Sequence, residues 1–106
     1  MRSRRLVPIA ALLSLAAMAV PAQAATIQIV MENLVILPAE TSVKAGDIIE
    51  WINKDIFVHT ATARNGDWDV TMPPKKTVTL VLKKAGAIDY YCRFHPNMKA
   101  TLTVGP

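Results

Sequence analysis

Short runs of alternating apolar and polar residues cover most of the chain after residue 25, and no window there has a helical period. A period of two is typical of strands with one buried face, whereas a helix repeats every 3.6 residues. The predicted strands are residues 26–31, 42–44, 47–53, 58–62, 77–82, 87–92 and 100–104. About seven or eight short strands separated by turns predict an all-β sandwich or barrel.

Turn signals separate these runs. Ala45-Gly46, Asn65-Gly66 and Ala85-Gly86 are dipeptides that favour tight turns, and Pro73-Pro74 prevents regular pairing before the run that begins at Thr77. In the run 47–53, Ile49 and Trp51 lie on one face of the pleat while Glu50 lies on the other. Ile49 and Trp51 are therefore predicted core residues.

The first 24 residues have the composition of a cleaved signal peptide. Arg2, Arg4 and Arg5 give a positive start, residues 6–20 are almost entirely apolar, and Ala22-Gln23-Ala24 supplies a small-x-small cleavage pattern. The apolar run is too short for a membrane span. We therefore expect cleavage after Ala24, export to the periplasm, and one mature domain over residues 25–106. Ser3-Arg4-Arg5 also resembles a twin-arginine signal, which leaves the export route open.

The charge balance argues against a nucleic-acid partner. The whole chain has a net charge of +4, but 3 of its 12 basic residues and none of its 8 acidic residues lie in the first 24 positions. The mature domain therefore has 9 − 8 = +1. Its lysines are scattered or paired and form no basic stripe, so we expect a domain that does not bind nucleic acid.

The single cysteine lies in a segment with three candidate metal ligands. Cys92 ends a predicted strand, and His95 and Met98 follow at equal intervals in the expected loop before the last strand. His59, the other histidine, opens the strand 58–62. Two imidazoles, a thiolate and a thioether form the donor set of copper electron-transfer sites, in which the thioether is a weak axial ligand. This pattern predicts one copper ion per chain.

Other kinds of site fit the residues less well. Zinc would accept the cysteine and histidines but gains little from a thioether. Covalent haem and thioredoxin chemistry each need a second cysteine, which the chain lacks. A nucleophilic Cys92 with a histidine base is conceivable, but a domain of this size offers little room for a substrate cleft. We therefore expect a protein that is not an enzyme.

Four segments resemble the cupredoxins, which are small blue copper proteins, and within them the plastocyanin/amicyanin group. They are residues 33–40, 43–47, 51–55 and 89–98, and the likeness extends over essentially the whole mature domain. The two-residue gaps on either side of His95 match the compact ligand loop of amicyanin. This resemblance implies a Greek-key β-sandwich.

The resemblance also implies roles for individual residues. His59 and His95 would bind copper through ring nitrogens, Cys92 through its thiolate and Met98 axially. Asn53 would join the two ligand loops by hydrogen bonds. His95 would reach the surface inside an apolar ring, for which the candidates are Pro96, Pro73 and Met72.

The expected function is one-electron transport in the periplasm, with brief docking to redox partners such as a c-type cytochrome or a dehydrogenase. We expect a monomer with no membrane span after cleavage. The alternative is a periplasmic copper-binding or trafficking protein that passes on the metal rather than the electron. Copper stores and chaperones usually have Met-rich or His-rich tracts, whereas residues 25–106 contain three methionines and two histidines.

Overall fold

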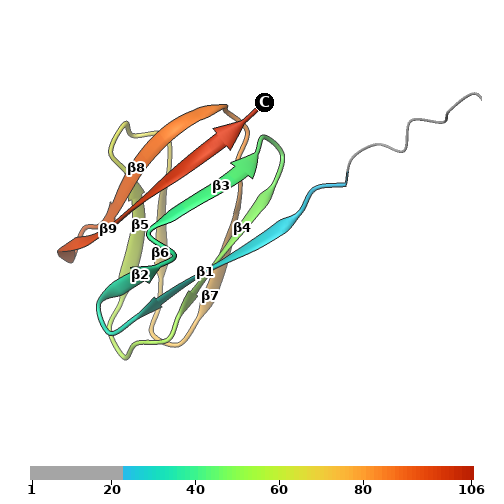
Figure 1. Ribbon diagram of the computed structural model, residues 1–106. Coiled ribbons are helices and arrows are strands. Elements are labelled where there is room, and N and C mark those ends of the chain that lie inside the picture. Colours follow the sequence, from blue (N-terminus) through green and yellow to red (C-terminus); the bar gives the residue numbers. More distant parts are fainter. Residues whose placement is uncertain (1–22) are drawn as a thin grey trace, which may run out of the picture.

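Two β-sheets face each other in the computed structural model, which describes residues 23–106 (Figure 1). The expected signal peptide therefore lies almost entirely outside the described residues. The strands are β1 Thr26–Glu32, β2 Val35–Leu37, β3 Glu40–Lys44, β4 Ile48–Asn53, β5 His59–Ala63, β6 Asp69–Met72, β7 Thr77–Val81, β8 Gly86–Cys92 and β9 His95–Gly105. The described part of the chain contains no helix that is long and apolar enough to cross a membrane. The all-β sandwich is as predicted.

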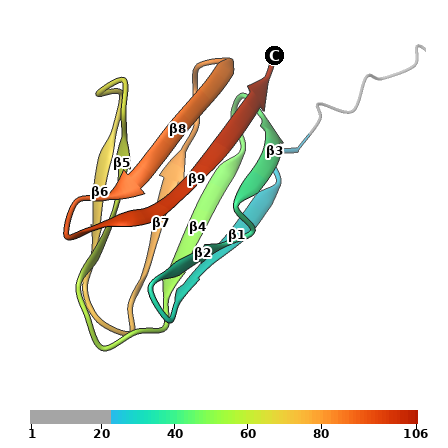
Figure 2. The same cartoon turned by 60° about the vertical axis from the view of Figure 1, so that its left-hand side comes forward.

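The strand order places the strands that hold His59, Cys92, His95 and Met98 in one sheet. The first sheet has the order β2-β1-β4-β7, and the second has the order β3-β9-β8-β5-β6. β1 pairs with β4 in parallel, and β3 pairs with β9 in parallel, while the other pairs are antiparallel. Figure 2 shows β8 and β9 of the second sheet in front of β7 and β4 of the first.

The core between the sheets is built from the inward residues of the alternating runs. Ile49 and Trp51 have no exposed surface, as their place in the pleat predicted. The rings of Trp51, Trp68 and Tyr90 pack against one another with centroids 5.4–5.8 Å apart, and Trp51 Nε1 donates to the Tyr90 hydroxyl at 3.3 Å. Burial raises the pKa of Tyr90 to about 12, although the hydrogen bond from Trp51 opposes this shift.

Two strands and one loop differ from the expectations. β2 was not predicted, because all three of its residues are apolar. Val35 and Leu37 are apolar although they are exposed, so no apolar–polar alternation is visible in the sequence. β6 was not predicted either, since it is a short edge strand with two polar residues next to Pro73. His95 and Met98 do not lie in a loop: β9 already begins at His95, because the Cys92–His95 pair closes a tight hairpin.

The β3–β4 turn is fixed by one carboxylate. Asp47 Oδ2 accepts from the Lys44 N–H at 2.8 Å, and Asp47 Oδ1 accepts from the Ala25 N–H at 3.0 Å. Gly46 takes a φ of +94°, which a residue with a side chain rarely adopts. The hydrogen bonds from Lys44 and Ala25 lower the pKa of Asp47 below its usual value, although desolvation opposes them.

Candidate metal centre

The β8–β9 hairpin brings Cys92 next to His95. A two-residue turn, Arg93-Phe94, connects the strands, and Cys92 is the Cα partner of His95. The register shifts between Tyr91 and Cys92, which is the sign of a bulge. Cys92 Sγ and His95 Nδ1 lie 3.6 Å apart as a result.

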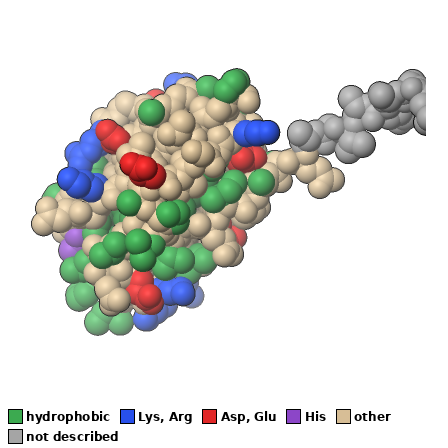
Figure 3. Space-filling view, viewed as in Figure 1, with side chains coloured by type: hydrophobic (Ala, Val, Ile, Leu, Met, Phe, Trp, Pro, Cys, Tyr) green, Lys and Arg blue, Asp and Glu red, His purple; other side chains and the backbone are tan. Residues whose placement is uncertain are grey.

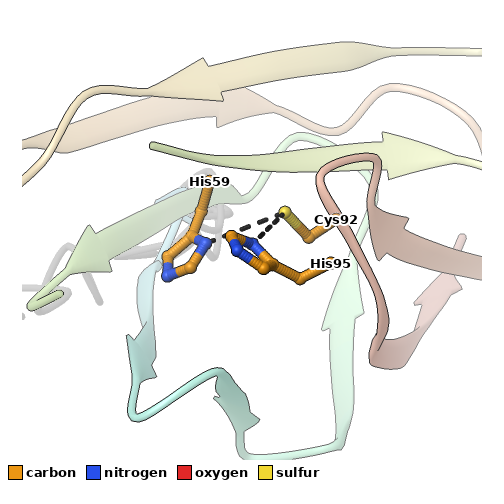
Figure 4. A group of neighbouring side chains, drawn as sticks. All are labelled: His59, Cys92 and His95. Atoms are coloured by element: carbon orange, nitrogen blue, oxygen red, sulfur yellow. Dashed lines mark hydrogen bonds between the residues drawn. The ribbon is translucent and has the colours of Figure 1, made fainter. Parts of the chain in front are cut away.

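The third member of the cluster comes from a strand far away in the sequence. His59 opens β5, which pairs with β8, and its Nδ1 lies 3.7 Å from Cys92 Sγ (Figure 4). The rings of His59 and His95 are nearly perpendicular, with centroids 5.1 Å apart. One ligand atom from each of His59, Cys92 and His95 lies within 4.8 Å of the others. Sequence reasoning named these three residues, and the structure brings them together.

The distances within the cluster fit a shared metal ion. Metal bonds of about 2.3 Å to sulfur and about 2.0–2.1 Å to imidazole nitrogen place the two ligand atoms about 3.6–3.8 Å apart, for angles between tetrahedral and trigonal. The two nitrogen–sulfur distances of 3.6 and 3.7 Å match this range. Two imidazoles and one thiolate form a donor set consistent with one copper ion.

Met98 lies on β9, three residues after His95, and its side chain is buried. Its position follows from the pairing of β8 with β9, which keeps the start of β9 next to the end of β8. Its role as an axial ligand stays a prediction.

Thr60 connects the segment of His59 to that of Cys92, a role that the family resemblance implied for Asn53. The Thr60 N–H donates to Cys92 Sγ at 3.3 Å, and the Arg93 N–H donates to Thr60 Oγ1 at 2.9 Å. Asn53 Nδ2 instead donates to the carbonyl groups of Phe57, Met72 and Pro73 at 2.8–3.2 Å. The Asn53 side chain therefore joins the loop before His59 to the β6–β7 loop. Thr60 was missed because a threonine after a histidine looks like any strand residue.

The hydroxyl of Thr60 belongs to a longer hydrogen-bonded chain. Thr60 Oγ1 and Thr62 Oγ1 are 2.9 Å apart, and Thr62 Oγ1 donates to Asp69 Oδ1 at 2.7 Å. Arg93 Nε closes the ring by donating to the same oxygen at 3.2 Å. These hydrogen bonds lower the pKa of Asp69, first through Thr62 and also through Arg93, although desolvation opposes them. The end of β8 is thereby fixed to β5 and β6.

Asp55 is a second residue that sequence reasoning missed. Its Oδ2 lies 2.7 Å from His59 Nε2, on the side of the ring opposite to Cys92. Desolvation raises the pKa of Asp55, but hydrogen bonds from His59 and from the N–H groups of Leu34 and Asn33 outweigh it and lower the pKa overall. The interval of four residues between an acid and a histidine was the available signal.

Apolar side chains lie beside the partly exposed ring of His95. Figure 3 shows a histidine side chain next to a group of hydrophobic side chains, and His95 is the partly exposed histidine of the cluster. The ring of Phe57 packs edge-on against that of His95, with centroids 5.9 Å apart. Exposed large apolar side chains from this end of the molecule are Leu34, Val35, Leu37, Ile56, Phe57, Val58 and Phe94.

The predicted members of this ring differ in where they lie. Pro96 and Pro73 are exposed, which is compatible with the surface. Met72 has no exposed surface and belongs to the core, because it is the strand partner of His59 and faces inward. The prediction that Met72 lines the surface ring is therefore wrong. The prediction did not include Phe57 and Phe94, which are exposed aromatic residues.

The fold and the donor set together define a small metal-binding β-sandwich, and the comparisons name its family. Residues 5–104 match the cupredoxin-like domain family, and the chain belongs to it. Amicyanin from Paracoccus versutus is 28% identical over 95 residues, which cover 84% of this chain and 70% of that protein.

Solved structures give the same result. A reduced proline-to-phenylalanine mutant of amicyanin superimposes with a TM-score of 0.65 at 27% identity, covering 74% of this chain and 81% of that one. A Cu(I) structure of a methionine-to-alanine mutant of amicyanin superimposes with a TM-score of 0.66 at 25% identity, with the same coverage. This chain is a cupredoxin similar to amicyanin.

Proposed function

We propose that this protein is a periplasmic one-electron carrier that holds one copper ion with His59, Cys92, His95 and Met98. The observation that carries the proposal is the meeting of two imidazoles and one thiolate within 4.8 Å in a cupredoxin fold. When bound, copper supplies the Cu(II)/Cu(I) couple, for which this donor set is suited. The signal-peptide pattern of residues 1–24 supports export.

The residues around the cluster hold its geometry in place. The Thr60 N–H directs a hydrogen bond at the Cys92 sulfur, and Asp55 fixes the far side of the His59 ring. His59 and Cys92 are both fully buried. Ligands fixed in this way move little between oxidation states, so little rearrangement opposes electron transfer.

His95 provides the route to a partner. It is the one partly exposed member of the cluster, and its ring touches Phe57 inside the apolar surface. A redox partner docking on this surface would come within a single imidazole of the metal. Such encounters bury little area, which allows fast release. The donor and acceptor would be redox proteins such as a c-type cytochrome or a dehydrogenase.

Metal trafficking is less well supported than electron transfer. Delivery of copper requires ligands that an acceptor can reach, but two of the three cluster members have no exposed surface. Catalysis is also poorly supported, because residues 23–106 contain a single group of His, Cys, Asp and Glu side chains close enough to hold a metal. An oxidase or reductase would need a second centre or an open coordination position.

The absorption spectrum of the Cu(II)-loaded protein tests the proposal. We expect an intense visible band from thiolate-to-copper charge transfer, and its loss in Cys92→Ser. Met98→Leu should keep the band and change the reduction potential, because the thioether is a weak ligand. A colourless Cu(II) complex would refute the proposed site, and slow electron self-exchange combined with rapid copper release would favour trafficking.

A further inference from the structure

The second ring nitrogen of His59 has the carboxylate of Asp55 as its partner. His59 Nε2 lies 2.7 Å from Asp55 Oδ2, and the two side chains are 0% and 11% exposed. Nδ1 of the same ring faces Cys92 Sγ. Because a metal ligand needs a lone pair on Nδ1, the proton of the neutral ring must reside on Nε2 and point at Asp55.

The carboxylate of Asp55 is held by the protein on its other sides. Its Oδ1 accepts from the Asn33 N–H at 2.7 Å, and its Oδ2 accepts from the Leu34 N–H at 3.1 Å. Asn33 and Leu34 have φ values of +54° and +61°, so the β1–β2 turn presents successive N–H groups to one anion. The Asp55 N–H donates to Asn53 Oδ1 at 2.9 Å. Asp55 is thus held by both the β1–β2 turn and β4.

No lysine or arginine among residues 23–106 forms an ion pair with Asp55. The ion pairs of this part of the chain are His59 with Asp55, Lys84 with Asp67, and Arg93 with Asp69. Lys75, which lines the same shallow groove as Asp55, directs its ammonium group to the carbonyl of Lys54. The negative charge of Asp55 therefore acts mainly on the imidazole of His59.

We propose that Asp55 is a positioning residue that fixes the tautomer and orientation of His59 and stabilises Cu(II) relative to Cu(I). An anionic acceptor on Nε2 increases the electron density on Nδ1 and makes the imidazole a stronger donor. A stronger donor favours the more highly charged metal. This inference rests on the proposed copper site, and it makes the β1–β2 turn part of the apparatus that sets the reduction potential.

The reduction potential of the Asp55→Asn variant is the main test. The amide keeps the size of the side chain and an oxygen acceptor but removes the charge. Partners of this kind change metal affinity by 10-fold to 100-fold. We expect the Cu(II)/Cu(I) equilibrium to shift about tenfold toward Cu(I), which is about 59 mV for a one-electron couple. Asp55→Glu keeps the charge and should recover part of the shift.

Glu32→Gln is the matched control. Glu32 lines the same shallow groove and is exposed, so its replacement removes one negative charge nearby without touching His59. We expect it to change the equilibrium by much less than Asp55→Asn. Equal effects of the two substitutions, or no effect of Asp55→Asn, would overturn the proposal.

A second measurement needs no substitution. In the diamagnetic Cu(I) protein, the Nε2 proton of His59 should give a strongly downfield NMR signal that exchanges slowly with water, because it is buried and bonded to a carboxylate. Exchange of the His59 Nε2 proton as fast as that of the His95 ring would contradict the assignment. A wild-type protein that fails to turn blue would instead refute the copper site itself, so the two failures are distinguishable.

Discussion

Thr60 connects the strand of His59 to the end of β8 at Cys92, although it is not itself one of the proposed copper ligands. Its N–H group reaches the sulfur of Cys92, and its hydroxyl accepts from the N–H of Arg93. It is fully buried, so water cannot replace these bonds. At the scale of single residues, the geometry of the site therefore depends on the hydrogen bonds around the cluster as well as on the cluster residues themselves.

Replacing Thr60 by valine should remove the hydrogen bond of the hydroxyl and keep that of the backbone N–H. The backbone N–H bond to sulfur stays, so the blue colour should persist, but the Arg93 N–H loses its acceptor. This hydrogen bond is part-buried, and the loss of such a bond costs about 0.5–1.5 kcal/mol. We expect the free energy of unfolding, measured with urea, to fall by about this amount. The control is Thr103→Val at an exposed position of β9; an equally small loss in both variants would contradict the role of Thr60.

At the level of strands, the sequence pattern of each strand decided whether it could be predicted. The alternation in β4 predicted its buried face correctly, because Ile49 and Trp51 contact the core on one side only. The cluster residues His59, Cys92 and His95 were found because few residue types offer a thiolate or an imidazole to a metal ion. β2 and β6 were missed since one has apolar residues on its exposed face and the other has little apolar character. The contacts of Thr60 depend on the pairing of strands about 30 residues apart, which a single sequence does not encode locally, whereas Asp55 lies four residues before His59 and was within reach of sequence reasoning.

The tight β8–β9 hairpin yields a prediction about register. A glycine inserted between Arg93 and Phe94 would lengthen the two-residue turn and shift β9 relative to β8. Because side chains alternate along a strand, a shift of one residue moves His95 to the other face. We expect the charge-transfer band to disappear while the far-ultraviolet circular dichroism persists.

The same insertion between Asn65 and Gly66, in the turn after β5, is the control for the hairpin experiment. It should leave the colour unchanged, because this turn holds none of the cluster residues. Retention of the band after the Arg93–Phe94 insertion would mean that the hairpin does not set the position of His95.

The β3–β4 turn gives a pH-dependent prediction. The pKa of Asp47 is lowered in the folded protein, so its stabilising effect is full above the unfolded value of 3.8 and disappears as the pH falls through the lower folded value. The variant Asp47→Asn should therefore have a lower Tm than the wild type at neutral pH, with the difference shrinking below about pH 3.8. Thermal unfolding from pH 7 to pH 2.5 measures this.

Glu40→Gln, at an exposed position of β3, is the control for Asp47→Asn and should keep a Tm near that of the wild type at every pH. A Tm difference between wild type and Asp47→Asn that stays constant down to pH 2.5 would contradict the ionised state of Asp47 as the source of the stability.

At the scale of the whole molecule, the sandwich brings together His59 and Cys92, which are 33 residues apart in sequence. Pairing of β5 with β8 places His59 beside Cys92, so the cluster exists only when the second sheet is formed. Metal binding and folding are therefore linked: an ion that binds the folded protein stabilises it.

Copper removal should show this linkage directly. A free copper concentration of 100 times Kd adds about 2.7 kcal/mol to the stability of the folded protein. For a domain of this size, this corresponds to a rise in Tm of roughly 10–20 °C. Differential scanning calorimetry with and without a chelator measures the change. Cys92→Ser should show a much smaller shift, and an equal shift in that variant would place the stabilising ion elsewhere.

The contact between Ala25 and Asp47 has a consequence for maturation. If export removes the first 24 residues, the nitrogen that now donates to Asp47 as a peptide N–H becomes the terminal ammonium of the finished protein. A charged amine beside a carboxylate attracts it more strongly than a neutral amide does. Cleavage by the peptidase would then strengthen the interaction between the start of β1 and Asp47 in the β3–β4 turn. A single extra residue left before Ala25 would weaken this interaction.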